Sequence, residues 1–351
     1  MSLSKEEQSR YQRHLILPGF GESAQEKLKA ASILVIGAGG LGCPALLYLA
    51  ASGFGRIGII DDDIVSESNL HRQILFSSED IGQYKATVAK DKLRKTNPFI
   101  QIDTFTENLG IHNAISILKN YDMVMDGTDN FTTRYLVNDA CIILNKPLIS
   151  GSIFTFEGQV SVFNYQDGPT YRCLFPEAPS AEEMPNCAEI GVLGVLPGVV
   201  GTIMATEAIK IATGIGEVLS GKLLVYNALT MDFHRLDFQS VAENKLITSL
   251  TEKNINCSVT SELTSFQLKQ KLALDENLHL IDVREEDEHA IFNIGGENLP
   301  LSKLKSLAHR IPKDRIVVFY CKSGLRSKKA VELLENEFTN LYNLKNGLAD
   351  W

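Results

Sequence analysis

The chain has 351 residues, of which 44% are apolar and 22% charged, a composition typical of globular proteins and a length that suits two domains. Its formal net charge of −9 argues against a general nucleic-acid binder, because contacts with phosphates need a basic surface. No apolar run is long enough to span a bilayer, and the polar N-terminus has no signal-peptide core, so we expect a cytoplasmic protein that binds no membrane.

The first part of the chain alternates short apolar runs, several of which end in glycine or aspartate, with helical segments. Strands are expected at 32–37, 56–61 and 121–126, and helices at 41–53, 81–96 and 131–144. This alternation predicts an α/β fold of Rossmann-like type, in which helices cover both faces of a mostly parallel sheet.

The pattern changes after residue 147. Strands at 147–151, 158–165 and 221–227 are expected to extend the sheet in an antiparallel manner, together with an apolar helix at 192–213. A smaller α/β alternation follows, with strands at 278–283 and 315–320 and a helix at 327–336. We therefore predict a first domain at 1–240, a polar linker at 241–258 and a second domain at 259–351.

A glycine-rich turn follows the first strand, with the sequence GAGGLG. Glycines Gly37, Gly39, Gly40 and Gly42 fit the GxGxxG pattern between a strand and a helix, where backbone N–H groups and the helix N-terminus favour a phosphate. Asp61 ends the next strand about twenty residues later, where a carboxylate can accept hydrogen bonds from ribose hydroxyls. The pattern predicts a nucleotide site.

Further polar residues follow the same strands and are candidates for cofactor binding. They occur in the segments IDDDI, SNLHRQ, GQYK and DGTDN, and include Asp63, Asn69, Gln73 and Asn130. These segments supply two cations, amides and carboxylates near the carboxyl ends of the strands, where ligands bind in such sheets. Hydride transfer by an NAD-dependent oxidoreductase needs no such set, whereas a triphosphate with Mg²⁺ does. The oxidoreductase, with the second domain as a regulator, remains the alternative.

With these motifs, residues 10–237 resemble the MoeB/ThiF adenylyltransferases, relatives of the ubiquitin-activating enzymes. The resemblance implies a homodimer that uses ATP and Mg²⁺ to adenylate the C-terminal Gly-Gly carboxylate of a ubiquitin-like sulfur-carrier protein. A carboxylate of the partner would attack the α-phosphate of ATP and release pyrophosphate. Positioning and charge stabilisation would then carry most of the catalysis.

The resemblance also assigns roles to individual residues. Asp61 would hold the ribose, and Gln73 would line the same pocket. Asn69, Arg72 and Lys85 would contact the phosphates, and Arg13 would reach them from the other subunit. Asp129 would hold Mg²⁺. Arg13 and Arg72 could instead be surface ion-pair residues, and Asp63 a turn residue.

The cysteines form no CxxC pair. Many relatives bind a structural zinc through two such pairs, but this chain has Thr170 in place of one cysteine and no CxxC beyond the first domain, so we expect no zinc. Cys187 lies in a Pro-containing acidic segment that reads as a loop. In family members with a fused tail domain, a cysteine in this loop takes part in acyl or sulfur transfer. The alternative for Cys187 is an ordinary exposed thiol.

A second cysteine loop follows the strand at 315–320. The segment Cys321-Lys322-Ser323-Gly324-Leu325-Arg326 places a thiol before a helix N-terminus, and its two cations add positive charge, all of which favours the thiolate. With LIDVR upstream and NGLADW at the end, residues 260–351 resemble a rhodanese domain whose Cys321 would carry a persulfide. A phosphatase of this fold is the alternative, but its loop has one more residue between cysteine and arginine.

We therefore predict an adenylyltransferase with sulfurtransferase activity that converts the carrier's C-terminal carboxylate into a thiocarboxylate. The sulfur donor would be a cysteine desulfurase or thiosulfate. Molybdopterin synthesis is the expected end use, with thiamine synthesis and tRNA thiolation as alternatives. A non-catalytic module that only docks a ubiquitin-like protein is the third hypothesis, and the charged set around the glycine turn speaks against it.

Overall fold

The computed structural model describes residues 2–176, 191–250, 262–273, 278–313, 315–334, 337–338 and 340–351. The chain divides into two compact units, Met1–Cys257 and Ser258–Trp351. Residues 241–250 of the expected linker belong to the first unit. Within the described residues, no helix is long and apolar enough to cross a membrane.

The first unit contains an eight-stranded sheet in the order β3-β2-β1-β4-β5-β6-β7-β8. Strands β3 to β5 pair in parallel, and β5 to β8 continue as antiparallel neighbours, so the predicted mostly parallel sheet with an antiparallel extension is confirmed. The strands are β1 (Ser32–Ile36), β2 (Arg56–Ile60), β3 (Gln101–Phe105), β4 (Met123–Asp126), β5 (Leu148–Phe154), β6 (Glu157–Phe163), β7 (Lys222–Asn227) and β8 (Asp232–Asp237).

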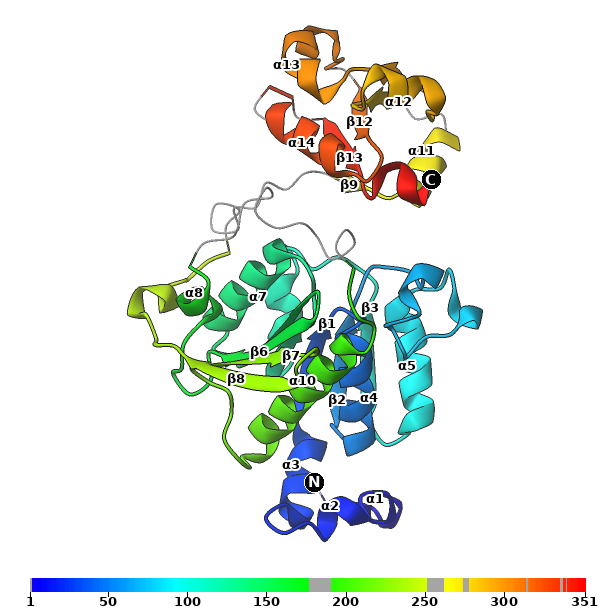
Figure 1. The fold of residues 1–351 in the computed structure, drawn as a ribbon. Helices are drawn as coiled ribbons and strands as arrows, with labels where there is room; N and C mark the ends of the chain where they lie inside the picture. Colours follow the sequence, from blue (N-terminus) through cyan, green and yellow to red (C-terminus); the bar gives the residue numbers. More distant parts are fainter. Residues whose placement is uncertain are drawn as a thin grey trace. The chain divides into compact units, whose positions relative to one another are not determined.

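Two layers of helices enclose this sheet (Figure 1). The helices are α1 (Lys5–Arg10), α2 (Gln12–Leu15), α3 (Gly21–Ala30), α4 (Gly42–Ser52), α5 (Lys85–Thr96), α6 (Ala114–Leu118), α7 (Phe131–Ile143), α8 (Tyr171–Leu174) and α10 (Leu196–Thr213), with 3-10 turns η1 (Glu67–Asn69), η2 (Ser78–Asp80) and η3 (Ala242–Lys245). Alternate residues of β1 enter different cores: Ile33 packs with α4, α5 and α10, whereas Leu34 packs with α6 and α7.

Two predicted helix starts in the first unit were wrong. The helix expected from residue 81 begins at Lys85, because Gly82 adopts a left-handed φ of 85° and the chain turns there. The helix expected from residue 192 begins at Leu196, with Pro197 in its first turn, where the missing N–H of proline costs nothing. Strands β3 and β8 of this unit were not predicted; in the second unit, three of the five strands were not predicted, and the helix expected from residue 327 begins at Leu325.

The second unit has a five-stranded parallel sheet in the order β11-β10-β12-β13-β9, which confirms the predicted small α/β domain. Its elements are β9 (Glu262–Leu263), α11 (Ser265–Ala273), β10 (Leu278–Asp282), α12 (Glu286–Ile291), β11 (Glu297–Asn298), η5 (Leu301–Lys303), α13 (Leu304–Leu307), η6 (Ala308–Arg310), β12 (Ile316–Tyr320), α14 (Leu325–Leu334), β13 (Leu341–Leu344) and η7 (Gly347–Asp350).

A buried charged cluster joins β10 to α12. The fully buried carboxylate of Asp282 accepts hydrogen bonds from Arg284, whose Nη2 lies 2.6 Å away, and from Nδ1 of His289 at 2.9 Å. Burial alone would raise the pKa of Asp282, but the hydrogen bonds from Arg284 and His289 outweigh it and lower that pKa. Arg284 also donates to the carbonyl of Phe292, at the end of α12.

We predict that Asp282→Ala destabilises the second unit by about 3–5 kcal/mol, because it leaves the buried Arg284 charge without its partner. Trp351 is the single tryptophan of the chain, so its fluorescence during urea unfolding reports this unit. The control is Asp287→Ala, which removes an exposed carboxylate from the neighbouring helix α12. Equal unfolding midpoints for the two variants would contradict the structural role of Asp282.

Candidate functional site

The glycine turn lies between β1 and α4, at the carboxyl edge of the parallel strands. Gly37 adopts a left-handed φ of 87°, and a Cβ there would lie 3.3 Å from the carbonyl oxygen of Gly127. A Cβ on Gly42 would lie 2.0 Å from the carbonyl oxygen of Gly37. A side chain at Gly37 would therefore crowd the loop that follows β4, and one at Gly42 would clash with the turn itself.

Asp61, directly after β2, orders the glycine turn. Its Oδ2 accepts the N–H of Ala38 at 2.7 Å, and its Oδ1 accepts the N–H of Asp63 at 2.9 Å. Burial raises the pKa of Asp61, although nearby Lys85 opposes this shift. Each carboxylate oxygen keeps a second lone pair, so the predicted contact with a ribose hydroxyl is compatible with these bonds.

Lys85 is a buried cation at the start of α5. Its side chain is only 5% exposed, and its Nζ lies 2.9 Å from Oδ2 of Asp63. Burial alone would lower the pKa of Lys85, but Asp61 and Asp63 reverse this effect and raise it, so the side chain stays charged. Sequence analysis placed Lys85 and Asp63 at the same site without detecting that they form an ion pair.

Asn69, Arg72 and Gln73 come to the glycine turn from the segment around η1. Nη2 of Arg72 donates to Oδ1 of Asn69 at 2.5 Å, and Cδ of Arg72 lies 3.7 Å from the position of a Cβ on Gly40. Nε2 of Gln73 lies 3.8 Å from the corresponding position on Gly39. Gln73 is buried, and its Oε1 has no hydrogen-bond partner within the described part of the chain.

The loop after β4 presents Asp129 to solvent. Buried Asp126 shapes this loop, because its Oδ1 accepts the N–H and the hydroxyl of Thr128 at 2.9 and 2.7 Å. Burial raises the pKa of Asp126, and its Oδ2 is a second buried oxygen without a partner among the described residues. Asn130, predicted to bind cofactor, uses its Oδ1 to cap α7 by accepting the N–H of Thr133 at 2.8 Å.

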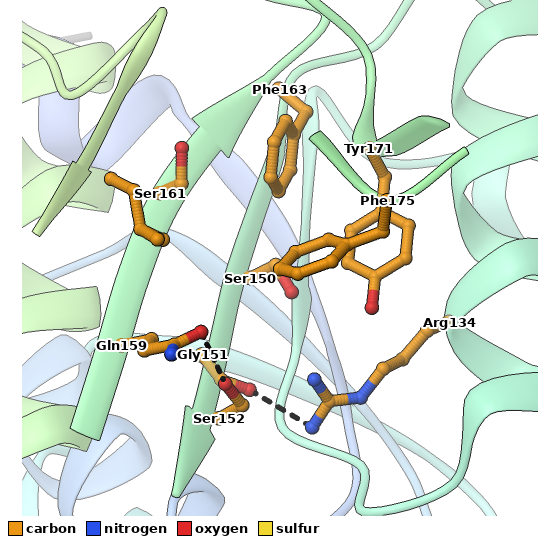
Figure 2. Close-up of a pocket in the computed structure, with 10 residues that line it drawn as sticks. Arg134, Ser150, Gly151, Ser152, Gln159, Ser161, Phe163, Tyr171 and Phe175 are labelled. Carbon is orange, nitrogen blue, oxygen red and sulfur yellow. Dashed lines mark hydrogen bonds between the residues drawn. The ribbon is translucent and has the colours of Figure 1, made fainter. Parts of the chain in front are cut away.

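Arg134, on α7, is a site residue that sequence analysis missed. Its Nη2 donates to the carbonyls of Thr128 at 2.7 Å and Gly151 at 3.3 Å, and so joins the Asp129 loop to β5. Figure 2 shows this guanidinium at a small cavity of about 10 Å³. The cavity is lined by polar and aromatic side chains that include Ser150, Ser152, Gln159, Ser161, Phe163, Tyr171 and Phe175. The available signal was its place on the helix that directly follows the DGTDN segment.

Arg13 lies on α2, at the opposite edge of the sheet from the glycine turn. Nearby residues bind the C-terminal end of α5: Arg10 donates to the carbonyl of Thr96, and the Tyr11 hydroxyl accepts from Asn97, whose side chain also donates to the carbonyl of Ala50 in α4. Helices α4 and α5 begin at the site and run away from it for roughly 16 Å. The exposed Arg13 is thus about one helix length from the site of its own chain.

The residues around the glycine turn fit ATP and Mg²⁺. Arg72 and Lys85 supply positive charge, and the unpartnered oxygen of Gln73 can accept a hydrogen bond from a ligand. No three His, Cys, Asp or Glu side chains gather as a metal site in the described residues. Mg²⁺ usually needs only one or two carboxylates in addition to substrate phosphates and water, so Asp129 remains a suitable ligand.

Cys173 is surrounded by hydrogen-bond donors. Its sulfur accepts from Thr170, from the N–H of Val241 at 3.3 Å and from the side chain of Asn244 at 3.7 Å. Burial alone would raise the pKa of Cys173, but these donors outweigh it and lower that pKa. The expected absence of zinc stays a prediction, and Cys187 lies outside the described residues.

Cys321 directly follows β12 and begins the loop that leads into α14. Its side chain is 1% exposed, and its sulfur accepts the hydroxyl of Ser327 at 3.4 Å. Gly324 has a left-handed φ of 87°, which turns the loop into the helix. Arg326 makes two hydrogen bonds to Glu288, at 2.6 and 2.8 Å. Sequence analysis treated the charge of Arg326 as available to the thiolate and missed this pairing.

Comparisons with known proteins match both units. The ThiF family model matches residues 11–247, and the rhodanese-like domain model matches residues 266–351. A probable adenylyltransferase/sulfurtransferase MoeZ of Mycobacterium tuberculosis is 44% identical over 100% of this chain and 94% of its own length. A probable molybdopterin-synthase adenylyltransferase of Porphyra purpurea is 44% identical over 99% of this chain and 94% of its own. A sulfur carrier protein adenylyltransferase of Thermus thermophilus is 51% identical over 67% of this chain and 89% of its own.

Proposed function

We propose that this chain, which belongs to the ThiF family and ends in a rhodanese-like domain, adenylates the C-terminal glycine carboxylate of a ubiquitin-like sulfur-carrier protein and converts it into a thiocarboxylate. Its relatives over nearly the full length establish it as an ATP-using adenylyltransferase and sulfurtransferase. The names of two relatives support a sulfur carrier as substrate and molybdopterin synthesis as end use. The family match leaves the NAD-dependent oxidoreductase without support.

The observation that carries the adenylation proposal is the charged set at the carboxyl edge of the parallel strands. Asp61 would hold the ribose, and Arg72 and buried Lys85 would offset the charge of the triphosphate. Mg²⁺ held at Asp129 would compensate charge on the leaving pyrophosphate. The carrier carboxylate would attack the α-phosphate, forming one P–O bond as the bond to pyrophosphate breaks.

Arg134 suggests where the tail of the carrier lies. One nitrogen of Arg134 binds carbonyls from both the Asp129 loop and β5, so a tail that runs along β5 would arrive beside Asp129. Ser150 and Ser152, on the same face of β5, offer small polar side chains (Figure 2). A Gly-Gly end fits such a path, because glycine has no side chain to clash.

The sulfur steps would use Cys321 and Cys187. A persulfide on Cys321 would attack the acyl carbon of the adenylate, form a C–S bond and expel AMP. The thiolate of Cys187 would then attack the sulfur of Cys321, form a disulfide and release the carrier thiocarboxylate. A thiol reductant would regenerate both cysteines. The location of Cys321 between a strand and a helix N-terminus supports its role.

Substituting Asp129→Asn should lower carrier-dependent exchange of pyrophosphate into ATP by at least about 100-fold, since the charge compensation at the phosphates is lost. Binding of the carrier, measured by calorimetry, should persist. The matched control Asp91→Asn alters an exposed aspartate on α5 and should leave exchange intact. Full exchange activity in the Asp129 variant would contradict the proposal that Asp129 is a metal ligand.

The position of Arg13 predicts that each site is completed by a second subunit. Separately, Arg13→Ala and Asp129→Asn should both be inactive. After the two variants are mixed under conditions that exchange subunits, exchange activity should return to about a quarter of the wild-type value, because half of the dimers are mixed and each has one intact site. A mixture that stays inactive, although mass spectrometry detects mixed dimers, would contradict this arrangement.

Substituting Cys321→Ala should abolish the sulfane sulfur that mass spectrometry detects on the chain after incubation with thiosulfate or a persulfide. Cys173→Ser provides the control, because Cys173 belongs to the first unit and the proposal gives it no sulfur-transfer step. The adenylation activity of both variants should remain. Sulfur loading that survives in the Cys321 variant would contradict the proposed carrier of the persulfide.

A further inference from the structure

The ion pair between Glu288 and Arg326 lies next to the sulfur-transfer loop. Both terminal nitrogens of Arg326 donate to the carboxylate, Nη1 at 2.6 Å and Nη2 at 2.8 Å. Glu288 contributes most to raising the pKa of Arg326, which also interacts electrostatically with Cys321. The guanidinium in the loop of Cys321 is therefore neutralised by a carboxylate from another element, α12.

The position of Glu288 is fixed by α12 itself. Its Oε2 accepts the N–H of Glu285 at 3.3 Å, which completes a capping box, while His289 and Arg284 tie the same helix to buried Asp282. Arg326 holds the pKa of Glu288 at about 2, so this carboxylate is charged at any physiological pH. The pairing is thus part of the fold of the second unit.

This pairing limits what Arg326 can bind. An arginine recognises a small dianion best through two parallel N–H···O bonds, and Glu288 occupies the pair of N–H groups that Nη1 and Nη2 offer at the end of the guanidinium. Arg284 is likewise paired with Asp282. Among the described ion pairs none involves Lys322, which is exposed and is the other cation of the loop. Three further carboxylates on α12 or at its cap, those of Glu285, Glu286 and Asp287, are exposed and add negative charge.

From this geometry we propose that Glu288 is a specificity-determining residue: it keeps Arg326 from clamping thiosulfate, so that Cys321 takes its sulfur from a cysteine persulfide. The inference rests on the proposed role of Cys321 as sulfur carrier. The thiolate of Cys321 attacks the outer sulfur of the donor, a new S–S bond forms, the donor S–S bond breaks, and the donor leaves as its thiol. No external oxidant or reductant is required.

The test compares two donors on the full-length chain at low ionic strength, with cyanide as the sulfur acceptor. The donors are thiosulfate and the persulfide of N-acetylcysteine methyl ester, which has no charged group besides the persulfide. Glu288→Gln should lower the KM for thiosulfate roughly threefold to tenfold, while the KM for the persulfide and both kcat values stay within twofold. Glutamine still completes the capping box, so the fold should persist.

The matched control is Glu286→Gln, which removes the same charge from the same helix, where Glu286 pairs with Lys303 at 2.9 Å instead of with Arg326. It should leave the KM for thiosulfate unchanged. Adding Arg326→Gln to the Glu288→Gln variant should abolish the decrease in the KM for thiosulfate. Glu288→Asp, which retains the charge, should have a KM for thiosulfate close to that of the wild type. Fluorescence of Trp351 during thermal unfolding checks the fold of every variant.

The proposal would be overturned if Glu288→Gln left the KM for thiosulfate unchanged or raised it. An equal loss of kcat with both donors would also overturn it, because Glu288 would then only position Arg326 for sulfur transfer. A wild-type chain that takes sulfur from neither donor would instead contradict the proposed function of Cys321.

Discussion

The parallel pairing of β1 with β2 on one side and β4 on the other is the constraint on which the adenylation site depends. In this register Ile36 is the partner of both Ile60 and Asp126, so the three strands end at the same edge of the sheet. Backbone bonds then tie the loops together, from the N–H of Gly37 to the carbonyl of Ile60 and from Gly127 to Ile36. Residues from distant parts of the sequence therefore meet around one glycine turn.

Buried charge follows a consistent pattern in both units. Lys85 and Asp282 are buried and have oppositely charged partners, which offset the cost of removing them from water. By contrast, Oε1 of Gln73 and Oδ2 of Asp126 are buried oxygens without partners in the described residues. A buried oxygen without a hydrogen-bond partner lowers the stability of the fold unless a ligand supplies the partner. Both oxygens lie beside loops of the proposed nucleotide site. Their position supports a site completed by its substrate.

Sequence analysis predicted most strands, because short apolar runs that end in glycine or aspartate indicate buried parallel strands. It missed β8, since all six of its residues are exposed and show no alternation. It also predicted that the motif residues lie at one edge of the sheet, but it did not predict which of them form ion pairs. Lys85 and Asp63 are separated by 22 residues, and Arg326 and Glu288 by 38, so no periodic pattern joins them. These pairings depend on loop geometry.

The central claim is that one chain activates a carboxylate with ATP and replaces one of its oxygens by sulfur. The most direct measurement is intact-mass spectrometry of a candidate Gly-Gly carrier after incubation with the enzyme, ATP, Mg²⁺ and a persulfide donor. The account predicts a mass gain equal to the replacement of one oxygen by one sulfur, and no gain when ATP is omitted. An unchanged carrier mass, under conditions in which the same carrier supports pyrophosphate exchange, would contradict it.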